Sequence, residues 1–437
     1  MRLILAVLTW FSLSFAAAAE VEIQDITTPA GLDAWLVEEH SIPFTALELR
    51  FRGGTSLDAP GKRGAVYLMT ALLEEGAADM DAREFARAQE TLAAAFSFDA
   101  SDDSVSISAR FLTENRDAAL ALLRAAIHEP RFDPDGVERV RAQIIASLQN
   151  DAKDPDSIAR KVFSRLAFGD HPYGSDGEGT VESVAALTRA DLVQAHRDVF
   201  ARDRLYIGAV GDITPEELGA LIDDLLGALP AEGREIPGPA EVLLTGGDTV
   251  VEFETPQSVA VFGQAGIERR DPDFFAAYVL NQVLGGGSFE SRLMNEVREK
   301  RGLTYGVYSY LAPKDLAAVY LGSVASANDR IAEAVQVIRD EWTRAATQGV
   351  TEQEVEDAKT YLTGAYPLRF DGNGQIAQIL AGMQMEGLPI DYVATRNDQV
   401  KAVTVEDVNR VAADLLDPDG LRFVIVGQPV GITESTN

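Results

Sequence analysis

The feature that most constrains the fold of this chain is the internal repetition of one helix-strand unit. Segments 187–218 and 403–429 share the same order: a capping threonine, a helix, a short loop, and a buried apolar strand that ends in glycine. The threonines are Thr188 and Thr404, about 216 residues apart, and threonine is a favoured residue at a helix N-terminus. Two such copies in 437 residues indicate a duplicated domain.

Each half of the chain opens with strands and continues with helices. Apolar and polar residues alternate over 31–38 and 45–51 in the first half, and over 248–254 and 258–264 in the second. In the first half a predicted hairpin and predicted helices follow; their ranges are 94–100 and 104–111 for the hairpin, and 115–127 and 134–150 for the helices. Strands grouped with helices in this way predict an α+β fold in each half.

The N-terminus has the composition of a secretory signal peptide. It carries one positive charge at Arg2, an apolar run over 3–15, and small residues up to Ala19. The run is short for a membrane span, and no later segment offers the roughly 20 apolar residues that a spanning helix needs. We therefore expect residues 1–19 to be removed on export to the periplasm, with no membrane insertion afterwards.

The mature chain divides at a segment rich in Gly, Pro and charged residues. This segment, 231–248, has no sustained periodicity and is typical of a linker. We predict an N-terminal domain over 20–230 and a C-terminal domain over 249–437.

Charge and cysteine content exclude several classes of function. The chain has 69 acidic and 38 basic residues, a formal net charge of −31, which repels nucleic acid and anionic membranes. It has no cysteine, so neither disulfides nor thiolate chemistry contribute.

Four segments resemble the pitrilysin/insulinase metallopeptidases and the mitochondrial processing peptidase. They span most of the mature chain in order: 53–77, 169–192, 284–309 and 387–416. The resemblance implies two tandem homologous α/β-sandwich domains, each a mostly antiparallel sheet backed by helices, that enclose an unfolded peptide.

The zinc site of this family is missing from the sequence. Active members carry His-x-x-Glu-His after a glycine turn that is present here at 61–64, but the motif positions fall on Tyr67, Thr70 and Ala71. The third ligand, a glutamate, falls on Ser147, or on Leu148 in a register shifted by one. These residues cannot bind zinc or activate water, so we expect no metal in this chain.

The few histidines offer no replacement. None of the four has another histidine at helical ligand spacing; they are His40, His128, His171 and His196. We expect them to be solvated or hydrogen-bonded residues rather than metal ligands.

The second half retains a pair that the resemblance marks as functional. Arg298 is expected on the last turn of a helix that ends at Gly302, and Tyr305 on a strand over 303–310. In active relatives an Arg and a Tyr at this separation donate hydrogen bonds to the carbonyl of the scissile bond. The sequence also allows a plainer interpretation: Arg298 as a solvated residue of the charged run 296–301, and Tyr305 as a core residue.

A chain that lacks the zinc site but keeps the Arg/Tyr pair is predicted to supply only one part of a peptidase active site. We expect a non-catalytic, substrate-binding subunit, inactive alone, that pairs with a homologous zinc-bearing chain and binds extended peptides. The alternative is a stand-alone periplasmic peptide-binding or scaffold protein without peptidase activity. The sequence supports no independent peptidase with a different site.

Overall fold

The computed structural model describes residues 22–287 and 289–432. The predicted signal peptide, residues 1–19, lies outside this part. Among the described residues, no helix has both the length and the apolar character needed to cross a membrane.

The first half is built on a six-stranded sheet whose order is β1-β2-β8-β3-β7-β6. All neighbours are antiparallel except β2 and β8, which run parallel. The strands are β1 (Gln24–Thr27), β2 (Asp33–Glu38), β3 (Phe44–Arg52), β6 (Ala95–Ala100), β7 (Ser104–Leu112) and β8 (Leu205–Gly211), with a small hairpin of β4 (Gly76–Ala77) and β5 (Met80–Asp81) beside them. The helices are α1 (Ala65–Ala71), α2 (Ala82–Leu92), α3 (Arg116–His128), α4 (Pro134–Asp151), α5 (Pro155–Phe168), α6 (Val181–Ala186), α7 (Arg189–Val199) and α8 (Pro215–Leu226).

The second half repeats this plan on a five-stranded sheet of order β11-β12-β10-β13-β9. Its strands are β9 (Gly247–Glu252), β10 (Gln257–Ala265), β11 (Val307–Pro313), β12 (Ala318–Ala327) and β13 (Arg422–Gly427). Its helices are α9 (Phe274–Leu284), the π-helical turn η5 (Met294–Glu299), α10 (Ile331–Gln348), α11 (Glu352–Ala365), the 3-10 turn η6 (Tyr366–Arg369), α12 (Asn373–Met385), α13 (Tyr392–Ala402) and α14 (Val405–Leu415).

The structure confirms the duplication. Thr188 caps α7 through a capping box with Asp191, and Thr404 caps α14 through a capping box with Asp407. The strands that follow, β8 and β13, each pair in parallel with a strand near the start of their half and antiparallel with the next one along the chain. The two repeated units therefore occupy equivalent places in the two sheets.

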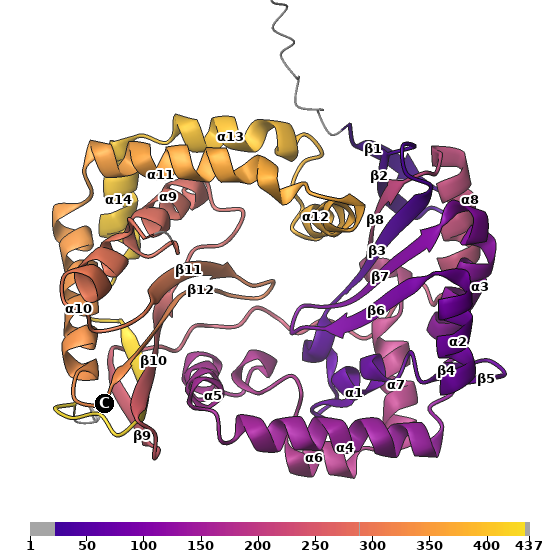
Figure 1. Ribbon diagram of the computed structural model, residues 1–437, viewed down its shortest axis with the longest axis horizontal. Coiled ribbons are helices and arrows are strands. Elements are labelled where there is room, and N and C mark those ends of the chain that lie inside the picture. The colour runs from indigo at the N-terminus through magenta and orange to yellow at the C-terminus, as the bar shows by residue number, and fades with distance from the viewer. Residues whose placement is uncertain (1–21, 288, 433–437) are drawn as a thin grey trace, which may run out of the picture.

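Each half contributes one helix that packs on the sheet of the other half. Helix α5 packs on the second sheet, where Phe163 contacts the cluster that contains Val261 and Val424. Helix α12 packs on the first sheet, where Leu380 lies with Trp35 and other apolar residues. In Figure 1, α12 and α5 each lie in the space between the two halves.

A glycine permits each of these close approaches. A Cβ at Gly208 of β8 would lie 2.3 Å from the carbonyl oxygen of Ala377 in α12. A Cβ at Gly263 of β10 would lie 2.8 Å from the ring of Phe163 in α5. Glycine inside a strand often marks such a site, where another element approaches the backbone closely.

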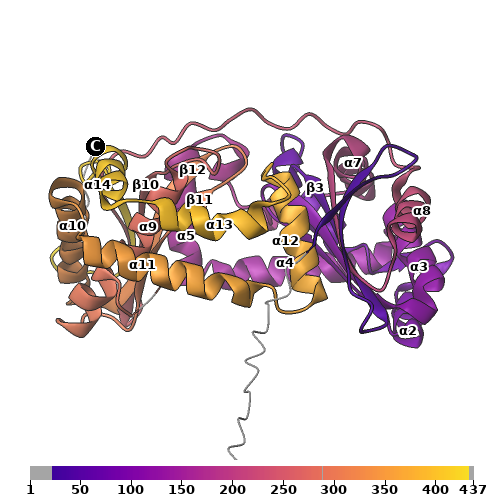
Figure 2. The ribbon, with the colours of Figure 1, turned by 90° about the horizontal axis from the view of Figure 1, so that it is seen from above.

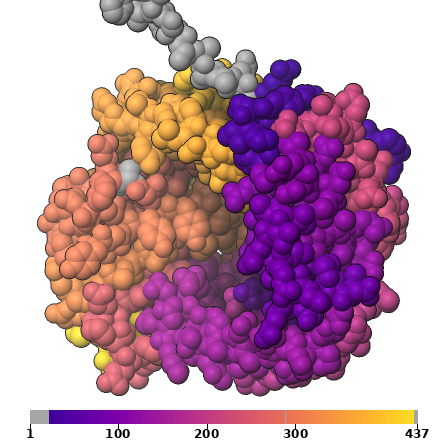
Figure 3. Space-filling model, turned by 45° about the vertical axis from the view of Figure 1, so that its right-hand side comes forward, coloured from indigo at the N-terminus to yellow at the C-terminus, as the bar shows by residue number. Residues whose placement is uncertain are grey.

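The halves also meet at their loops and enclose a hollow. In the turn between β11 and β12, Asp315 pairs with Arg52 of β3 at 2.5 Å, and Lys314 pairs with Asp102 at 2.7 Å. An extended segment between α8 and β9 crosses from the first half to the second (Figure 2). Figure 3 shows the surface hollowed between the two halves.

Candidate functional site

The positions of the family's zinc motif lie on α1 and α4 of the first half. Ala71 is exposed, Tyr67 is half-buried, and Thr70 is buried with no hydrogen-bond partner for its hydroxyl within the described residues. On α4, Ser147 is exposed and Leu148 is buried in the core, so Ser147 is the one of the two that faces away from the core.

The side chains present do not fit a zinc ion. Zinc in proteins is bound by imidazole, thiolate or carboxylate, and these positions offer a phenol, two hydroxyls and a methyl group. No group of three His, Cys, Asp or Glu side chains placed to hold a metal occurs in residues 22–287 and 289–432. The side chains at these four positions therefore do not fit the family's metal.

An acidic cluster lies next to the position of the first ligand. Burial raises the pKa of the Tyr67 phenol, and the adjacent Glu178 carboxylate raises it further. Burial and the nearby Asp176 and Asp151 raise the pKa of Glu178 in turn. Lys161 pairs with Asp176 at 2.8 Å, so part of this acidic charge is neutralised.

The turn that presents α1 is held by hydrogen bonds to a buried carboxylate. The buried carboxylate of Asp58 accepts hydrogen bonds from the backbone amides of Gly64 and Val66, both at 2.8 Å. Gly64 has a φ of 92°, a conformation that favours glycine. Burial raises the pKa of Asp58 to about 6, although the amides and Arg63 favour its ionised form.

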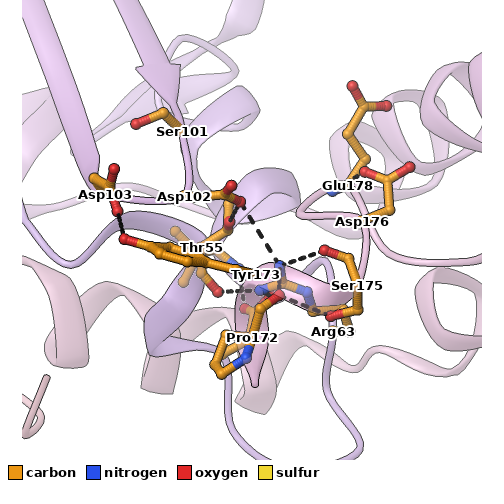
Figure 4. Close-up of polar contacts among 12 residues, drawn as sticks. Thr55, Arg63, Ser101, Asp102, Asp103, Pro172, Tyr173, Ser175, Asp176 and Glu178 are labelled. Carbon is orange, nitrogen blue, oxygen red and sulfur yellow. Dashed lines mark hydrogen bonds and ion pairs between the residues drawn. The ribbon is translucent and has the colours of Figure 1, made fainter. Parts of the chain in front are cut away.

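Arg63 ties this turn to a loop near the carboxyl end of α5. It donates to the carbonyl oxygens of Pro172 and Ser175, each at 3.0 Å, and to that of Thr55 (Figure 4). Its guanidinium therefore has carbonyl oxygens of two separate segments as partners. Neither residue was predicted from the sequence, although Arg63 lies within the glycine turn at 61–64 and Asp58 lies three residues before it.

The same loop connects the two halves through Tyr173. Its buried hydroxyl donates to Asp103 and accepts from the backbone amide of Leu316 at 3.1 Å (Figure 4). Burial, followed by the charge of Asp103, raises the pKa of Tyr173 far above its usual value, so the hydroxyl stays a donor. The glycine turn at 61–64 is thus linked, through the loop that contains Tyr173, to the turn between β11 and β12 of the second half.

The four histidines take part in hydrogen bonds within the fold. His196 is half-buried, contacts the carbonyl oxygen of Ile127 at 2.7 Å, and desolvation lowers its pKa to about 4. His40 lies on the surface between Asp212 and Glu38, whose hydrogen bonds raise its pKa. His128 and His171 contact backbone carbonyl oxygens.

Arg298 lies on η5, a π-helical turn, which is a rare conformation that often marks functional sites. Its guanidinium stacks 4.8 Å from the ring of Phe289 and reaches Glu299 at 3.4 Å. The neighbouring Lys300 and Arg301 both pair with Glu296 instead. Arg298 therefore differs from the other cations of its run, because it packs on an exposed aromatic ring.

Tyr305 is not in a strand, contrary to the prediction for 303–310. Strand β11 begins only at Val307, because the Thr304 hydroxyl accepts from the amide of Gly306 and donates to the carbonyl of Ala325, which holds 304–306 in a turn. The Tyr305 side chain is 90% exposed, so the interpretation as a core residue is wrong. No hydrogen bond joins Tyr305 to Arg298 in the described part of the chain.

Further tyrosines continue from this turn along β11. Tyr308 and Tyr310 are both exposed, and their rings stack with centroids 6.3 Å apart. Strand β11 is an edge of its sheet, as β6 is of the first sheet. A cavity of 240 Å³ lies beside β6 and is bordered by α12.

Comparison with known proteins decides the family. The profile of the insulinase family, peptidase family M16, matches residues 35–180, and that of the peptidase M16 inactive domain matches 186–362. The crystal structure of a peptidase M16 inactive domain from Pseudomonas fluorescens is 30% identical and superposes with a TM-score of 0.88 over 95% of this chain and 100% of that one. This chain belongs to peptidase family M16. The resemblance inferred from the sequence, and the fold it implied, are confirmed.

Relatives within family M16 carry different names. A non-peptidase homologue, YmxG, from Helicobacter pylori is 28% identical over 89% of this chain and 90% of its own length. An uncharacterized zinc protease from Mycobacterium leprae is 27% identical over 92% of this chain and 91% of its own length. The matches to the M16 inactive domain and to the non-peptidase homologue identify this chain as an inactive member of the family.

Proposed function

We propose that this M16 chain is the non-catalytic, substrate-binding subunit of a heterodimeric periplasmic zinc metalloendopeptidase that degrades peptides or unfolded segments. The observation that carries the proposal is the exposure of Tyr305 at 90%, six residues after a π-helical turn whose Arg298 stacks on the exposed Phe289. The exposed Phe289, Tyr308 and Tyr310 belong to the same half of the chain, and aromatic side chains, tyrosine above all, are enriched where proteins bind partners.

The pair has the chemistry to bind a peptide carbonyl. A guanidinium and a phenol are both hydrogen-bond donors, and negative charge develops on the carbonyl oxygen when a peptide bond is attacked. Donors placed in advance at that oxygen accelerate the reaction, even when the attacking group belongs to another chain. In the proposed heterodimer, a homologous subunit with His-x-x-Glu-His supplies the zinc, and Arg298 and Tyr305 face it.

The hollow between the halves suits an extended substrate. The free edge of β6 offers unpaired backbone groups to which a peptide strand can add, a mode that depends little on sequence. The exposed Tyr308 and Tyr310 supply apolar surface for its side chains. Export to the periplasm is supported by the composition of residues 1–19.

A second candidate is a stand-alone peptide-binding or scaffold protein. It is favoured by the non-peptidase name of the Helicobacter pylori relative, which aligns over 90% of its own length. In that case no zinc-bearing subunit is needed, and substitutions at Arg298 and Tyr305 do not change the rate of peptide hydrolysis in any assay.

The test is turnover by the reconstituted pair. This chain is mixed with the zinc-bearing M16 homologue of the same organism, and hydrolysis of an internally quenched peptide is followed. Arg298→Ala and Tyr305→Phe are each expected to lower kcat by about 10²-fold, the usual effect of losing one carbonyl-binding donor. The control Lys300→Ala removes a nearby cation that pairs with Glu296, and it should leave kcat unchanged. Full kcat in both Arg298 and Tyr305 variants would refute the assigned role.

A further inference from the structure

A cavity of 480 Å³ lies where α12 packs between the two halves, bordered also by α9, α13 and β11. Its volume is in the range of ordinary small-ligand sites. None of its lining residues belongs to the Arg298/Tyr305 region or to the degenerate zinc site.

The charge of this cavity is opposite to that of the chain. Among the charged side chains that line it, four are arginines and only Glu386 is acidic, in a chain with a net charge of −31. Glu386 is already paired with Arg269 at 3.3 Å. The other three arginines, Arg50, Arg369 and Arg396, come from separate elements of the fold.

Arg396 is the most unusual of them, because it is buried without a carboxylate partner. It is 4% exposed, and its hydrogen bonds go to the carbonyl oxygen of Leu362 and the side-chain oxygen of Asn397. Its guanidinium stacks on Tyr366 at 4.5 Å and lies 5.4 Å from Tyr278. No carboxylate of the described residues lies within 4.0 Å of it. A buried charge without a counter-ion is costly, which suggests that an anion completes the site.

The two remaining arginines leave donors available. Arg50 forms one hydrogen bond, from Nε to Glu48 at 3.1 Å, and its terminal nitrogens have no hydrogen-bond partner among the described residues. One of these nitrogens lies against Gly382 of α12, where a Cβ would be 3.0 Å away. Arg369 is exposed and has no ion-pair partner in the described part of the chain. Guanidinium groups of this kind suit carboxylates, which they can hold with two parallel hydrogen bonds.

Most of the remaining lining is aromatic or apolar, with Gln375 and Gln378 as further polar residues. Six aromatic side chains border the cavity, among them Tyr278 and Tyr366, together with Leu311, Ile379 and other apolar residues. Such walls favour an anion attached to an apolar body over a bare inorganic anion. We propose that this cavity binds a peptide carboxylate next to an aromatic or large aliphatic side chain, with Arg50, Arg369 and Arg396 as its cationic partners. This inference concerns the chain alone and does not depend on the proposed peptidase pairing.

The two sources of such a carboxylate are a peptide C-terminus and an acidic side chain. Isothermal titration of the full mature chain with three acetylated tripeptides separates them: Ala-Ala-Phe with a free carboxylate, the same peptide as its amide, and Ala-Phe-Glu as its amide. Binding of the first alone assigns the site to C-termini, and binding of the third alone to acidic side chains. The proposal would be overturned if the Ala-Ala-Phe amide or inorganic phosphate bound as tightly as the carboxylate peptide. It would also be overturned if no peptide bound at concentrations on the order of 10 mM.

Variants connect the binding to the cavity. Arg369→Ala and Arg50→Gln are each expected to weaken binding of the carboxylate peptide by about tenfold, the usual effect of losing one charged hydrogen-bond donor. Arg369 is exposed, so its loss should not affect folding. The control is Lys401→Ala on α13, which removes an exposed cation outside the cavity. Unchanged affinity in both arginine variants, or an equal loss in the control, contradicts the assignment.

Discussion

An ion pair helps to hold the segment that carries Arg298, and breaking that pair gives the sharpest stability prediction. Arg292, which is 9% exposed, donates to both carboxylate oxygens of Glu354 on α11, at 2.6 and 2.8 Å. It also donates to the carbonyl oxygen of Gly349 at 3.1 Å. The pair therefore anchors the start of the segment that leads into η5.

The size of the effect follows from the pKa of Glu354. Burial alone would raise it, but Arg292 and the Thr351 amide outweigh burial and hold the pKa at about 2, against 4.5 ordinarily. Such a shift corresponds to about 3 kcal/mol. Because the Glu354 side chain is 32% exposed, solvent screening reduces the expected loss. We expect Glu354→Gln to lower the free energy of unfolding by about 2 kcal/mol at pH 7.

The assay is urea denaturation followed by the fluorescence of Trp342, which is fully buried in the same half. Because the folded-state pKa of Glu354 is depressed, its contribution is complete above pH 4.5 and is lost as the pH falls toward 2. The difference between wild type and Glu354→Gln should therefore shrink at pH 3. The control Glu356→Gln changes the exposed carboxylate of a pair with Lys359, which also donates to the carbonyl oxygen of Val403, and should change stability by less than about 0.5 kcal/mol. Equal stabilities of the two variants at pH 7, or a difference between wild type and Glu354→Gln as large at pH 3 as at pH 7, would refute the reasoning.

Two further predictions concern the exchanged helix and the turn before α1. Leu380→Ala removes a fully buried side chain of α12 from the first sheet and should lower the free energy of unfolding by about 3 kcal/mol, measured by the fluorescence of Trp35 in the same cluster. The exposed Leu368→Ala serves as control, and equal effects would contradict the packing. The pKa of Asp58 is raised to about 6, so its ionisation destabilises the fold as the pH rises from about 4 to 6. The stability of wild type relative to Asp58→Asn should fall by about 2 kcal/mol between pH 4 and pH 7 in urea titrations, and a constant difference would show that Asp58 does not titrate in this range.

Local signals in the sequence predicted much of the fold. Capping boxes at Thr188 and Thr404 mark helix starts through side-chain hydrogen bonds that involve only near neighbours. Alternating apolar residues located β3 and β10 within one or two residues. The loss of the zinc ligands was also readable, since it depends only on residue types at fixed spacing.

Features that depend on distant segments were not predictable in this way. The turn at Tyr305 arises because the Thr304 hydroxyl donates to the carbonyl oxygen of Ala325 on β12. The alternation of apolar and polar residues in 303–310 cannot predict that contact. The exchange of α5 and α12 depends on which sheet each helix meets after the chain has crossed over. The arginines of the cavity come from β3, η6 and α13, so only the assembled fold brings them together.

The most direct test of the central claim compares peptide hydrolysis by this chain alone, by the zinc-bearing M16 homologue of the same organism alone, and by an equimolar mixture, with zinc content measured for each. The account predicts no zinc and no hydrolysis for this chain alone, and activity in the mixture that exceeds that of the homologue by at least about 10²-fold, as expected when carbonyl-binding donors are supplied. Full activity of the homologue alone, unchanged when this chain is added, would contradict it.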